Sequence, residues 1–538
     1  MEIAHSRPAQ PLLWAGKYLD GTVAGTPHPR PLPVTLCKDT KLCSGDTMSK
    51  FRTKIAKVFN HEGQRAYTLS DKGTLLQLAS TCLMNEPKFY GKPGEIETQI
   101  RTLSEKIIRD DPEFVLKVAL YLRKEMYLRS VPMYLLSIVA HEENGKQYVR
   151  SYAPHIITRA DEICESIGCY LNTYGKPIPN SLKKGVNDSF AKFDEYQFAK
   201  YFRKANHPNF IDVARLTHPR EPKDLLAKIM AEDLKAPYTW EVQLSKQDDR
   251  SKEEKWIELV NSGKMGYMAT LRNLRNILDT VQDQRTIRKV ADHLKNEDAV
   301  RKSMQFPFRF YSAFQMIKQN SNPYTKFVIG ALDKALAISF SNIPRMDGVT
   351  FITSDVSGSM SGFGISNKSM IRPYDIGILL SVGASKFTDG CIMGVFGTEF
   401  ATISPSTSRS ILQEVDGLQN LGTKVGHSTN GHKPIDFLTR KRRKVDRVLM
   451  FTDMQLWDSR YSGAKIKASW DRYRRVVNSD SFLYMFNLNA YGTVQFPASE
   501  RSVVNVGGWS DKVFDFIRVN EADPEAQVKK VESYSIDG

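Results

Sequence analysis

Five short oxygen-bearing side chains lie at spacings that suit a metal site. Asp355, Ser357 and Ser359 form the pattern D-x-S-x-S directly after an apolar run. Thr429 lies in the segment HSTNGHKP, and Asp453 ends the apolar run LMFTD. Two carboxylates and three hydroxyls are all hard oxygen ligands, the set that Mg²⁺ and similar divalent ions prefer. The five residues therefore predict a divalent-cation site, most simply for Mg²⁺.

A simpler interpretation of the same loop is that Ser-Gly-Ser caps the helix that follows it, because serine is a favoured helix N-cap. The additional presence of Asp453 favours the metal site. Enzyme motifs are absent from the sequence: there is no G-x-x-x-x-G-K-[ST] loop, and no G-x-G-x-x-G follows the first apolar run. The segment GSMSG carries Met360 where a nucleophile elbow has serine. We expect a binding protein and not an enzyme.

The elements that must position these residues alternate between strand and helix. Five apolar runs read as buried strands, at 349–355, 391–397, 446–453, 481–488 and 502–508. Helical patterns lie between them, at 373–388, 408–418, 432–442 and 463–477. This alternation predicts a parallel, doubly wound α/β sheet. Ligands of such sheets gather at the carboxyl ends of the strands, where Asp355 lies.

The chain before this domain is helical in pattern. Ile100, Ile107 and Ile108 follow a helical stripe, and Asp111-Pro112-Glu113 has the composition of a helix start. A later helix is expected to bury Phe327, Ala331 and Ala335 on one face. Helices of roughly 11–20 residues separated by short breaks favour a curved solenoid of stacked helix pairs. Because no strict period is present, a compact irregular bundle stays possible.

Length and composition set the domain organisation. At 538 residues the chain exceeds the roughly 250–300 residues of a single core. We expect an extended segment at 1–45, a helical region at 46–345, an α/β domain at 346–520 and a polar tail at 521–538. The sequence contains no apolar run of membrane-spanning length, its start is a poor secretory signal, and its six cysteines include no C-x-x-C. An intracellular protein that does not bind membranes is expected.

The net charge suggests a polyanionic partner. Lys and Arg number 76 against 60 acids, which gives +16 and a pI near 9.3. Basic residues concentrate in two helical segments. Interpretations simpler than RNA binding are that they form a solvated outer face, that Arg272 and Arg275 make ion pairs with acids, and that His218 has a structural role. If 200, 203, 204 and 207 lie on one helix, they share a face. The candidate RNA contacts are Lys183, Lys184, Lys200, Arg203, Lys204, His207, Arg215, His218, Arg272, Arg275, Arg285 and Arg288.

Aromatic residues lie among these basic segments and could stack on bases, although at helical spacing they are more often part of a core. They are Phe202, Phe210, Phe308, Phe310 and Tyr311. A separate basic run, RKRRK at 440–444, reads either as a nuclear signal or as the cationic last turn of a helix. We favour the helix end.

Two family resemblances follow from these motifs. The order D-x-S-x-S, Thr, T-D resembles the metal-ion-dependent adhesion site of von Willebrand factor A domains. Its threonine usually follows G-G, and here LGT offers Thr423 as an alternative; we prefer Thr429 because Asn430, Gly431 and Pro434 continue as in related sequences. MATLRNLRNIL, FPFRFYSAFQMIK and IDVARLTHP resemble the TROVE module of the Ro, telomerase-associated and vault proteins. The combination resembles the Ro ribonucleoprotein family over roughly 50–520.

This resemblance implies a fold and a function. The fold would be HEAT-like helical repeats that form a ring closed by the von Willebrand factor A domain. The partners would be a small noncoding Y-like RNA on the basic outer surface and the single-stranded ends of misfolded RNAs in the central hole. At the metal, one open position would accept an acidic group of a partner protein. We expect a cytoplasmic RNA-binding scaffold, with an additional nuclear location left open. The alternatives are a telomerase- or vault-associated subunit and a metal-dependent protein–protein adaptor.

Overall fold

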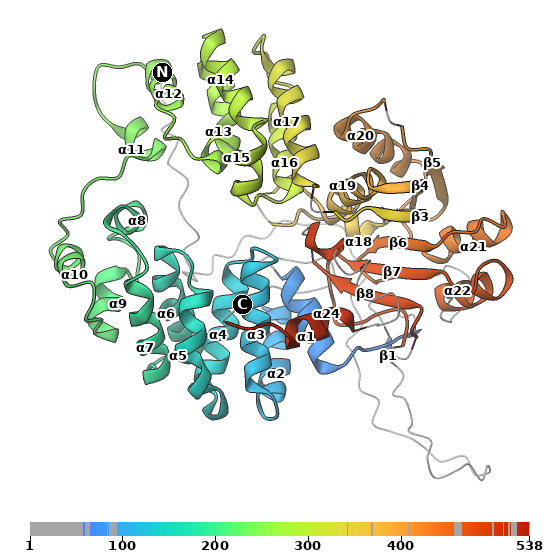
Figure 1. Cartoon of the computed structure of the whole chain (residues 1–538), viewed down its shortest axis with the longest axis horizontal. Coiled ribbons are helices and arrows are strands. Elements are labelled where there is room, and N and C mark those ends of the chain that lie inside the picture. Colours follow the sequence, from blue (N-terminus) through green and yellow to red (C-terminus); the bar gives the residue numbers. More distant parts are fainter. Residues whose placement is uncertain are drawn as a thin grey trace, which may run out of the picture.

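The computed structural model describes residues 58–59, 65–82, 84, 94–341, 343–366, 369–406, 408–456, 465–497, 500–508, 511–514, 517 and 525–536. The expected extended segment at 1–45 lies outside these ranges. Within them, a helical region precedes an α/β domain, as predicted (Figure 1). Among the described helices, none combines the length and the hydropathy that crossing a membrane requires.

The α/β domain is built on one six-stranded sheet. Its order is β5-β4-β3-β6-β7-β8, and all pairs are parallel except the antiparallel edge pair of β4 and β5. The five predicted strands are confirmed; the edge strand β5 was not predicted. The strands are β3 (Met346–Asp355), β4 (Thr388–Phe396), β5 (Phe400–Ile403), β6 (Arg447–Thr452), β7 (Phe482–Asn487) and β8 (Val503–Gly507).

Helices cover both faces of this sheet, which confirms the doubly wound prediction. Neighbouring strand residues point to opposite sides, so that Phe351 joins the core under one pair of helices and Ile352 joins the core on the other face. Trp470 is fully buried in the first of these cores. The helices of the domain are α18 (Gly358–Ser361), α19 (Pro373–Ser385), α20 (Ile411–Gly422), α21 (His432–Arg440) and α22 (Lys465–Val476).

The helical region consists of short helices whose apolar stripes pack on their neighbours. Asp111 caps α3 by accepting a hydrogen bond from the Phe114 N–H at 3.2 Å. The helices are α1 (Asp71–Thr81), α2 (Glu95–Ile108), α3 (Pro112–Lys124), α4 (Ser130–His141), α5 (Lys146–Ile156), α6 (Ala160–Tyr174), α7 (Asn180–Phe190), α8 (Glu195–Tyr201), α9 (Phe210–Thr217), α10 (Lys223–Met230), α11 (Trp240–Ser245), α12 (Lys252–Asn261), α13 (Tyr267–Thr280), α14 (Gln284–Leu294), α15 (Glu297–Ser303), α16 (Pro307–Ile317) and α17 (Thr325–Ser339).

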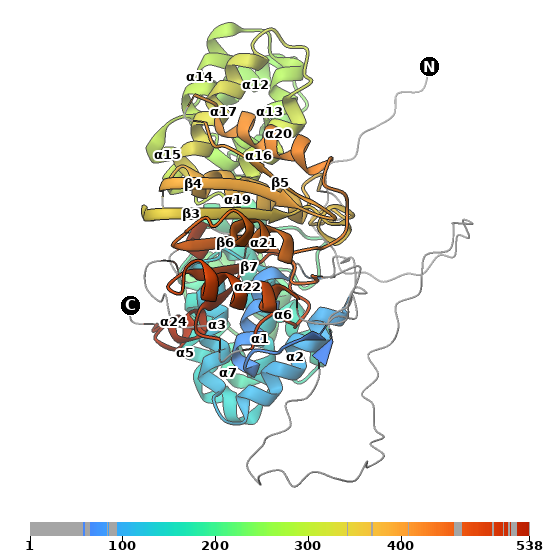
Figure 2. The ribbon, with the colours of Figure 1, turned by 90° about the vertical axis from the view of Figure 1, so that its right-hand side faces the viewer.

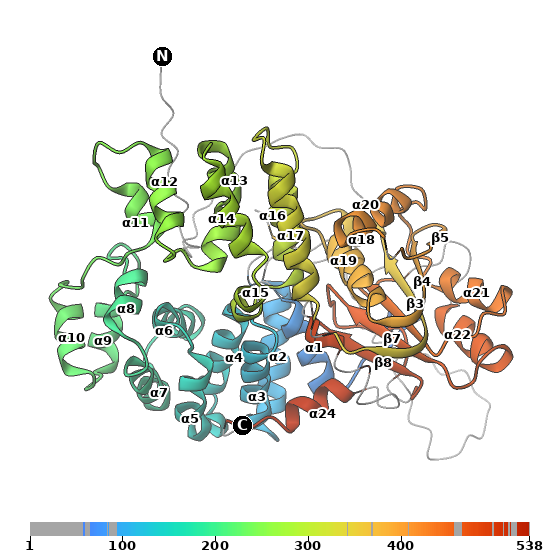
Figure 3. The same ribbon diagram turned by 45° about the horizontal axis from the view of Figure 1, so that its top comes forward.

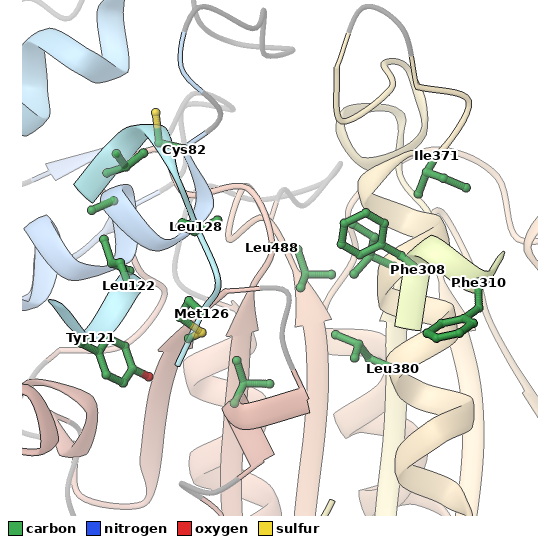
Figure 4. Close-up of a cluster of buried hydrophobic side chains, with 14 of the residues drawn as sticks. Cys82, Tyr121, Leu122, Met126, Leu128, Phe308, Phe310, Ile371, Leu380 and Leu488 are labelled. Carbon is green, nitrogen blue, oxygen red and sulfur yellow. The ribbon is translucent and has the colours of Figure 1, made fainter. Parts of the chain in front are cut away.

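These helices form two rows that both begin at the α/β domain. One row, α1 to α9, runs away from the sheet, and the other, α12 to α17, returns to it (Figures 1 and 3). Figure 2 shows the α/β domain from its outer side, with α21 and α22 toward the viewer. Near the strand ends, buried side chains of both rows approach the sheet: Leu128 and Phe308 lie on either side of Leu488 (Figure 4).

Three features differ from the sequence-based expectation. The stretch at 521–538 is not only a polar tail, because α24 (Ala526–Glu532) lies there and buries Val528 and Val531. A short antiparallel pair, β1 (Val58–Phe59) and β2 (Arg65–Ala66), precedes α1 in the region expected to be helical. In α17 Ala331 and Ala335 are buried as predicted, whereas Phe327 is 46% exposed and Val328 is buried instead, so the prediction was wrong for Phe327 alone.

Candidate metal centre and nucleic-acid interface

Asp355 is the last residue of β3, and its carboxylate is fully buried. The Ser357 N–H donates to Asp355 Oδ1 at 2.9 Å, and the Thr452 hydroxyl donates to Oδ2 at 2.8 Å. Both bonds fix the carboxylate in one orientation at the carboxyl end of the central strand. Thr452 was not among the predicted site residues, and its position directly before Asp453 was the only signal for it.

The two serines of D-x-S-x-S face each other. Ser357 Oγ and Ser359 Oγ lie 3.2 Å apart, and both residues are buried. Ser357 is the N-cap of α18, yet its side chain makes no capping hydrogen bond. The helix-capping interpretation of Ser-Gly-Ser therefore lacks the bond that defines it. The two hydroxyls instead contact each other.

The loop that carries Thr429 lies against this serine loop. The Gly358 N–H donates to the His427 carbonyl at 2.9 Å, and the Asn430 N–H donates to the Gly397 carbonyl at 3.1 Å. This approach requires glycine at 397, because a β-carbon there would lie 1.9 Å from the Gly426 carbonyl oxygen. The end of β4 therefore supports the Thr429 loop beside the end of β3.

The alternative ligand Thr423 lies in a different environment. It is exposed at the end of α20, and its hydroxyl donates to the Asn420 carbonyl at 2.8 Å. Thr429 is buried, only 4% exposed, in the loop that contacts Gly358. Geometry therefore favours Thr429 over Thr423 as the hydroxyl ligand.

Asp453 directly follows β6, the strand paired with β3, and is fully buried. The Gln455 N–H donates to Asp453 Oδ1 at 3.0 Å. Burial, and next the negative charge of Asp453, raise the pKa of Asp355 to about 7. Two buried carboxylates that affect each other in this way repel, and a bound cation would offset the repulsion.

The five predicted ligands are therefore all buried: Asp355, Ser357 and Ser359 at the carboxyl end of β3, Asp453 at that of β6, and Thr429 on the loop that contacts Gly358. In the part of the chain that the structure describes, no group of three or more His, Cys, Asp or Glu could hold a metal ion. The donor set at this site is instead two carboxylates and three hydroxyls, which fits a hard divalent ion better than zinc or copper.

The predicted RNA contacts fall on two separate parts of the helical region. We call the first the α7–α9 surface; Asn187 of α7 donates to the Thr217 carbonyl of α9 at 2.7 Å and joins the two helices. This surface comprises Lys183, Lys184, Lys200, Arg203, Lys204, His207, Arg215 and His218.

One expectation about this surface was wrong. Residues 200, 203, 204 and 207 do not share a helix face, because α8 ends at Tyr201 and the chain from 202 to 209 is not helical. Pro208 disfavours helical geometry at the residue before it. Asn209 then begins α9 through a capping box with Asp212. Lys200 is therefore presented by the last turn of α8, and Arg203, Lys204 and His207 by the loop between α8 and α9.

Most of the cations on the α7–α9 surface are exposed, and two have acidic partners. Lys204 pairs with Glu232 at 2.9 Å, and His207 Nδ1 lies 2.8 Å from Asp212. The Arg203 guanidinium donates through Nη1 to the Phe202 carbonyl at 2.7 Å and to the Lys200 carbonyl at 3.2 Å, and the residue stays exposed. For the described residues, no ion pair is found for the other members. They are Lys183, Lys184, Lys200, Arg215 and His218.

The second group, which we call the α13–α14 surface, lies in the returning row of helices (Figure 1). Arg272 and Arg275 on α13, and Arg285 and Arg288 on α14, are all exposed. Each pair has the three-residue spacing that places side chains on one helix face. The suggested ion pairs of Arg272 and Arg275 with acids do not form among the described residues.

The aromatic candidates for base stacking are mainly part of the core. Phe210, Phe308, Phe310 and Tyr311 are each at most 4% exposed, and only Phe202 is partly accessible. The Phe202 ring stacks on Phe210 with centroids 6.2 Å apart. The simpler interpretation, a packing role, holds for four of the five.

Family comparisons match both parts of the chain. The TROVE domain matches residues 59–233 and 227–330, which together cover about half of the chain. The Ro60 vWA domain matches residues 350–519, the part that contains all five candidate metal ligands.

Curated relatives match over shorter stretches. Telomerase protein component 1 of Rattus norvegicus is 25% identical over 329 residues, which cover 45% of this chain and 12% of that protein. RNA-binding protein RO60 of Deinococcus radiodurans is 23% identical over 206 residues, 36% of this chain and 38% of that one. The chain thus spans only a small part of the telomerase-named relative and well under half of the bacterial one.

A solved structure shares the fold over most of the chain. The crystal structure of the Deinococcus radiodurans RO (RSR) protein superposes with a TM-score of 0.58 and 16% sequence identity. The superposition covers 84% of this chain and 99% of that one. The helical region and the α/β domain are therefore arranged in this chain much as in that structure.

Proposed function

This chain belongs to the family of proteins that carry a TROVE domain and a Ro60 vWA domain, and from that premise we propose that it is the RNA-binding scaffold of a small ribonucleoprotein. The observation that carries the proposal is the α7–α9 surface, where exposed cations without acidic partners accumulate on one part of a chain of net charge +16. Such surfaces bind phosphate backbones with little dependence on sequence.

Two RNA-binding modes are proposed. A folded, Y-like noncoding RNA binds the α7–α9 surface, and a further segment of the same RNA binds the α13–α14 surface. Both contacts are of the kind expected for stem-loops, which are recognised by shape and phosphates. Single-stranded ends of misfolded RNAs enter between the two helical rows, as basic channels bind single strands. This gives the scaffold a role in RNA quality control without catalysis by the protein itself.

The second mode requires the helical rows and the α/β domain to form a ring, which we also propose. Its support is that both ends of the helical region contact the α/β domain. At one end, the Ala490 N–H donates to Thr81 of α1 at 3.1 Å. At the other end, the Leu412 N–H donates to Asp333 of α17 at 3.0 Å. The α/β domain thus bridges the first and the last helices.

We propose that Asp355, Ser357, Ser359, Thr429 and Asp453 hold a divalent cation, most simply Mg²⁺. The fit is supported by the all-oxygen donor set and by two buried carboxylates that need a counter-charge. A bound cation would supply a positive centre able to take a carboxylate of a partner protein. The chain's own contribution is the orientation of Asp355 by the Ser357 N–H and the Thr452 hydroxyl.

A second candidate function is supported by the telomerase-named relatives. The match to the Rattus norvegicus protein covers 45% of this chain, more than the match to the bacterial RO60 protein. The chain would then be an RNA-binding subunit of a telomerase-like or vault-like particle. Both functions require RNA, and they differ in which RNA is bound.

The test is to crosslink RNA to the protein in its native cells, purify the complex and sequence the bound RNA from cytoplasmic and nuclear fractions. The proposal predicts a short, structured noncoding RNA together with heterogeneous RNA ends, mainly in the cytoplasmic fraction. Enrichment of one telomerase-like or vault-like RNA would support the second candidate. Recovery of no RNA above a non-crosslinked control would contradict both.

A further inference from the structure

A second strongly basic area lies on the α/β domain, outside the surfaces described above. We call it the α21–α22 end. The last residue of α21 and the turn that follows it carry five consecutive cations, and the second half of α22 carries two more exposed ones, apart from the partly buried Arg474 that lies 3.9 Å from Glu500. Its members are Arg440, Lys441, Arg442, Arg443, Lys444, Arg472 and Arg475, and all seven are exposed.

The fold brings these two segments together. Tyr473 of α22 accepts a hydrogen bond from the Val445 N–H and donates one to the Arg443 carbonyl, each at 3.0 Å. Asn478 donates to the Val445 carbonyl at 2.9 Å. Figures 1 and 3 show α21 and α22 side by side at one end of the molecule. Because β6 starts at Arg447, the basic turn lies at the amino edge of the sheet, opposite the metal site.

The seven cations have no acidic partner among the described residues, although acids lie nearby in the sequence. Asp446 accepts the Val349 N–H at 2.6 Å, and Asp471 pairs with Lys467 at 2.8 Å. Glu500 accepts the Ser502 hydroxyl at 2.6 Å and lies 3.5 Å from Lys467. These three acids are thus engaged elsewhere, and none of the seven cations forms an ion pair in the described part of the chain.

Helix-dipole compensation explains only part of this charge. A cation in the last turn of a helix is stabilising, typically by about 0.3–1 kcal/mol, and the effect falls off within that turn. Arg440 fits this description, but Arg442, Arg443 and Lys444 follow the helix, with Arg442 in the left-handed region at φ 47°. Seven exposed cations of one sign repel one another, so a counter-charged partner would stabilise this arrangement.

The conformation of the basic run argues against recognition as an extended peptide. The N–H groups of Lys441, Arg442 and Arg443 donate to the carbonyls of Phe437, Thr439 and Leu438 at 2.9, 3.2 and 3.0 Å. Reading the run as an extended nuclear signal would break these bonds and the Tyr473 bonds. A membrane surface is also a poor fit, since among the described large apolar side chains of α21 and α22 only Val476 is exposed.

We propose that the α21–α22 end is a further RNA-binding surface, which contacts the phosphate backbone without reading the sequence. Five of the seven cations are arginines, whose planar guanidinium groups bind phosphate oxygens through paired hydrogen bonds. The inference rests on the proposed RNA-binding function and adds to it a contact made by the Ro60 vWA domain.

The position of this surface defines the RNA that it serves. The α21–α22 end and the α7–α9 surface lie at opposite ends of the longest axis of the molecule (Figure 1). A short stem-loop bound at α7–α9 would not reach the other end. A long RNA can contact both surfaces at once. Once it is bound at one surface, binding at the other is intramolecular, and this strengthens the whole complex.

The test compares the full-length wild type with the triple variant Arg442→Gln, Arg443→Gln, Lys444→Gln. Binding of a long, unstructured oligouridylate and of a short stem-loop is measured over a range of salt concentrations. For the long RNA, each lost phosphate contact should make the negative slope of log K against log salt less steep by about 0.7. The affinity for the long RNA should fall by roughly 10-fold to 100-fold at low salt. Stem-loop affinity should stay unchanged.

The matched control is Lys302→Gln, Lys326→Gln, Lys334→Gln, which removes the same charge from exposed positions on α15 and α17. Its affinity for the long RNA should stay within about 2-fold of wild type, because it loses no direct phosphate contact. Unaltered midpoints of thermal unfolding show that both variants are folded.

Three results would overturn the inference. If wild type binds the long RNA but the Arg442 variant binds it equally well with an equal salt slope, the α21–α22 surface is wrong and the proposed function stands. If the variant and the control lose long-RNA affinity equally, the effect comes from net charge and not from the α21–α22 end. If wild type binds neither RNA, both the inference and the proposed function fail.

Discussion

Asn487, the last residue of β7, donates a hydrogen bond from its side-chain amide to the Gln77 side chain of α1 at 3.0 Å, and both residues are buried. The two lie 410 positions apart in the sequence, so this bond joins the first helix of the TROVE domain to the sheet of the Ro60 vWA domain. Such a contact would support the proposed ring by anchoring its first helix.

Replacement of Gln77 by leucine should destabilise this junction. The change leaves the buried amide of Asn487 without its acceptor, which typically costs about 1–3 kcal/mol. Urea unfolding of the full chain measures the loss. The control is Gln147→Leu, at an exposed position of α5, which should change the free energy of unfolding by less than about 0.5 kcal/mol. Equal effects of the two variants would show that the junction contributes nothing specific.

Asp355→Ala should abolish divalent-cation binding. Mg²⁺ that binds only the folded state stabilises it by about 2.7 kcal/mol at a concentration of 100 Kd. Thermal unfolding of wild type should therefore shift upward with Mg²⁺, and the variant should show no shift. Because Asp355 lies far from the basic surfaces, stem-loop affinity should be unchanged. A full Mg²⁺ shift in the variant would refute the site.

The choice between two threonines can be tested separately. Thr429→Val removes a buried hydroxyl beside the serine loop and should weaken Mg²⁺ binding by at least about 10-fold, which corresponds to about 1.4 kcal/mol. Thr423→Val changes an exposed residue whose hydroxyl is bound to its own helix, and it should leave Mg²⁺ affinity intact. Isothermal titration of Mg²⁺ into both variants decides between the two threonines. A loss of Mg²⁺ affinity in Thr423→Val alone would reverse the assignment.

The α7–α9 surface should lose stem-loop affinity when its loop is made acidic. Lys200→Glu, Arg203→Glu and Lys204→Glu together replace three cations by anions, one in the last turn of α8 and two in the exposed segment that follows it. Affinity should fall by more than about 100-fold at low salt, and the salt slope should decrease by about 2–3. Filter binding compares this variant with Lys302→Glu, Lys326→Glu, Lys334→Glu, which carries the same charge change elsewhere. The comparison separates the effect of the position of the charges from that of net charge. Equal affinities of the two variants would refute this surface.

The α/β domain was predictable because its strands are continuous apolar runs. Residues 349–355 form β3 almost as expected, and the metal loop follows from its position after that strand. The edge strand β5 was missed, since Phe400–Ile403 is short and only half-buried, and such a strand lacks a long apolar signal. Thr452 was missed because its role depends on a pairing between β3 and β6 that the local sequence does not encode.

The basic surfaces were less predictable. Their residues could be identified by charge, but helical spacing was assumed through 207, whereas α8 ends at Tyr201 and α9 begins only after Asn209. In α17 the apolar residues Phe327 and Val328 are adjacent, so periodicity alone did not decide which faces the core. Docking of α24 on α1 and α3 depends on tertiary contacts such as the ion pair of Lys72 with Glu532 at 2.7 Å, for which a polar sequence gives no signal.

The central claim is that the chain binds RNA through its basic helical surfaces. It is tested most directly by the affinity of the wild-type chain for a structured noncoding RNA as salt rises from 50 to 200 mM. Contacts to about 6–10 phosphates predict a loss of roughly 10³–10⁵ in affinity over that range. RNA binding that is equally tight at both salt concentrations, or absent at both, would contradict the account and favour a protein-binding adaptor.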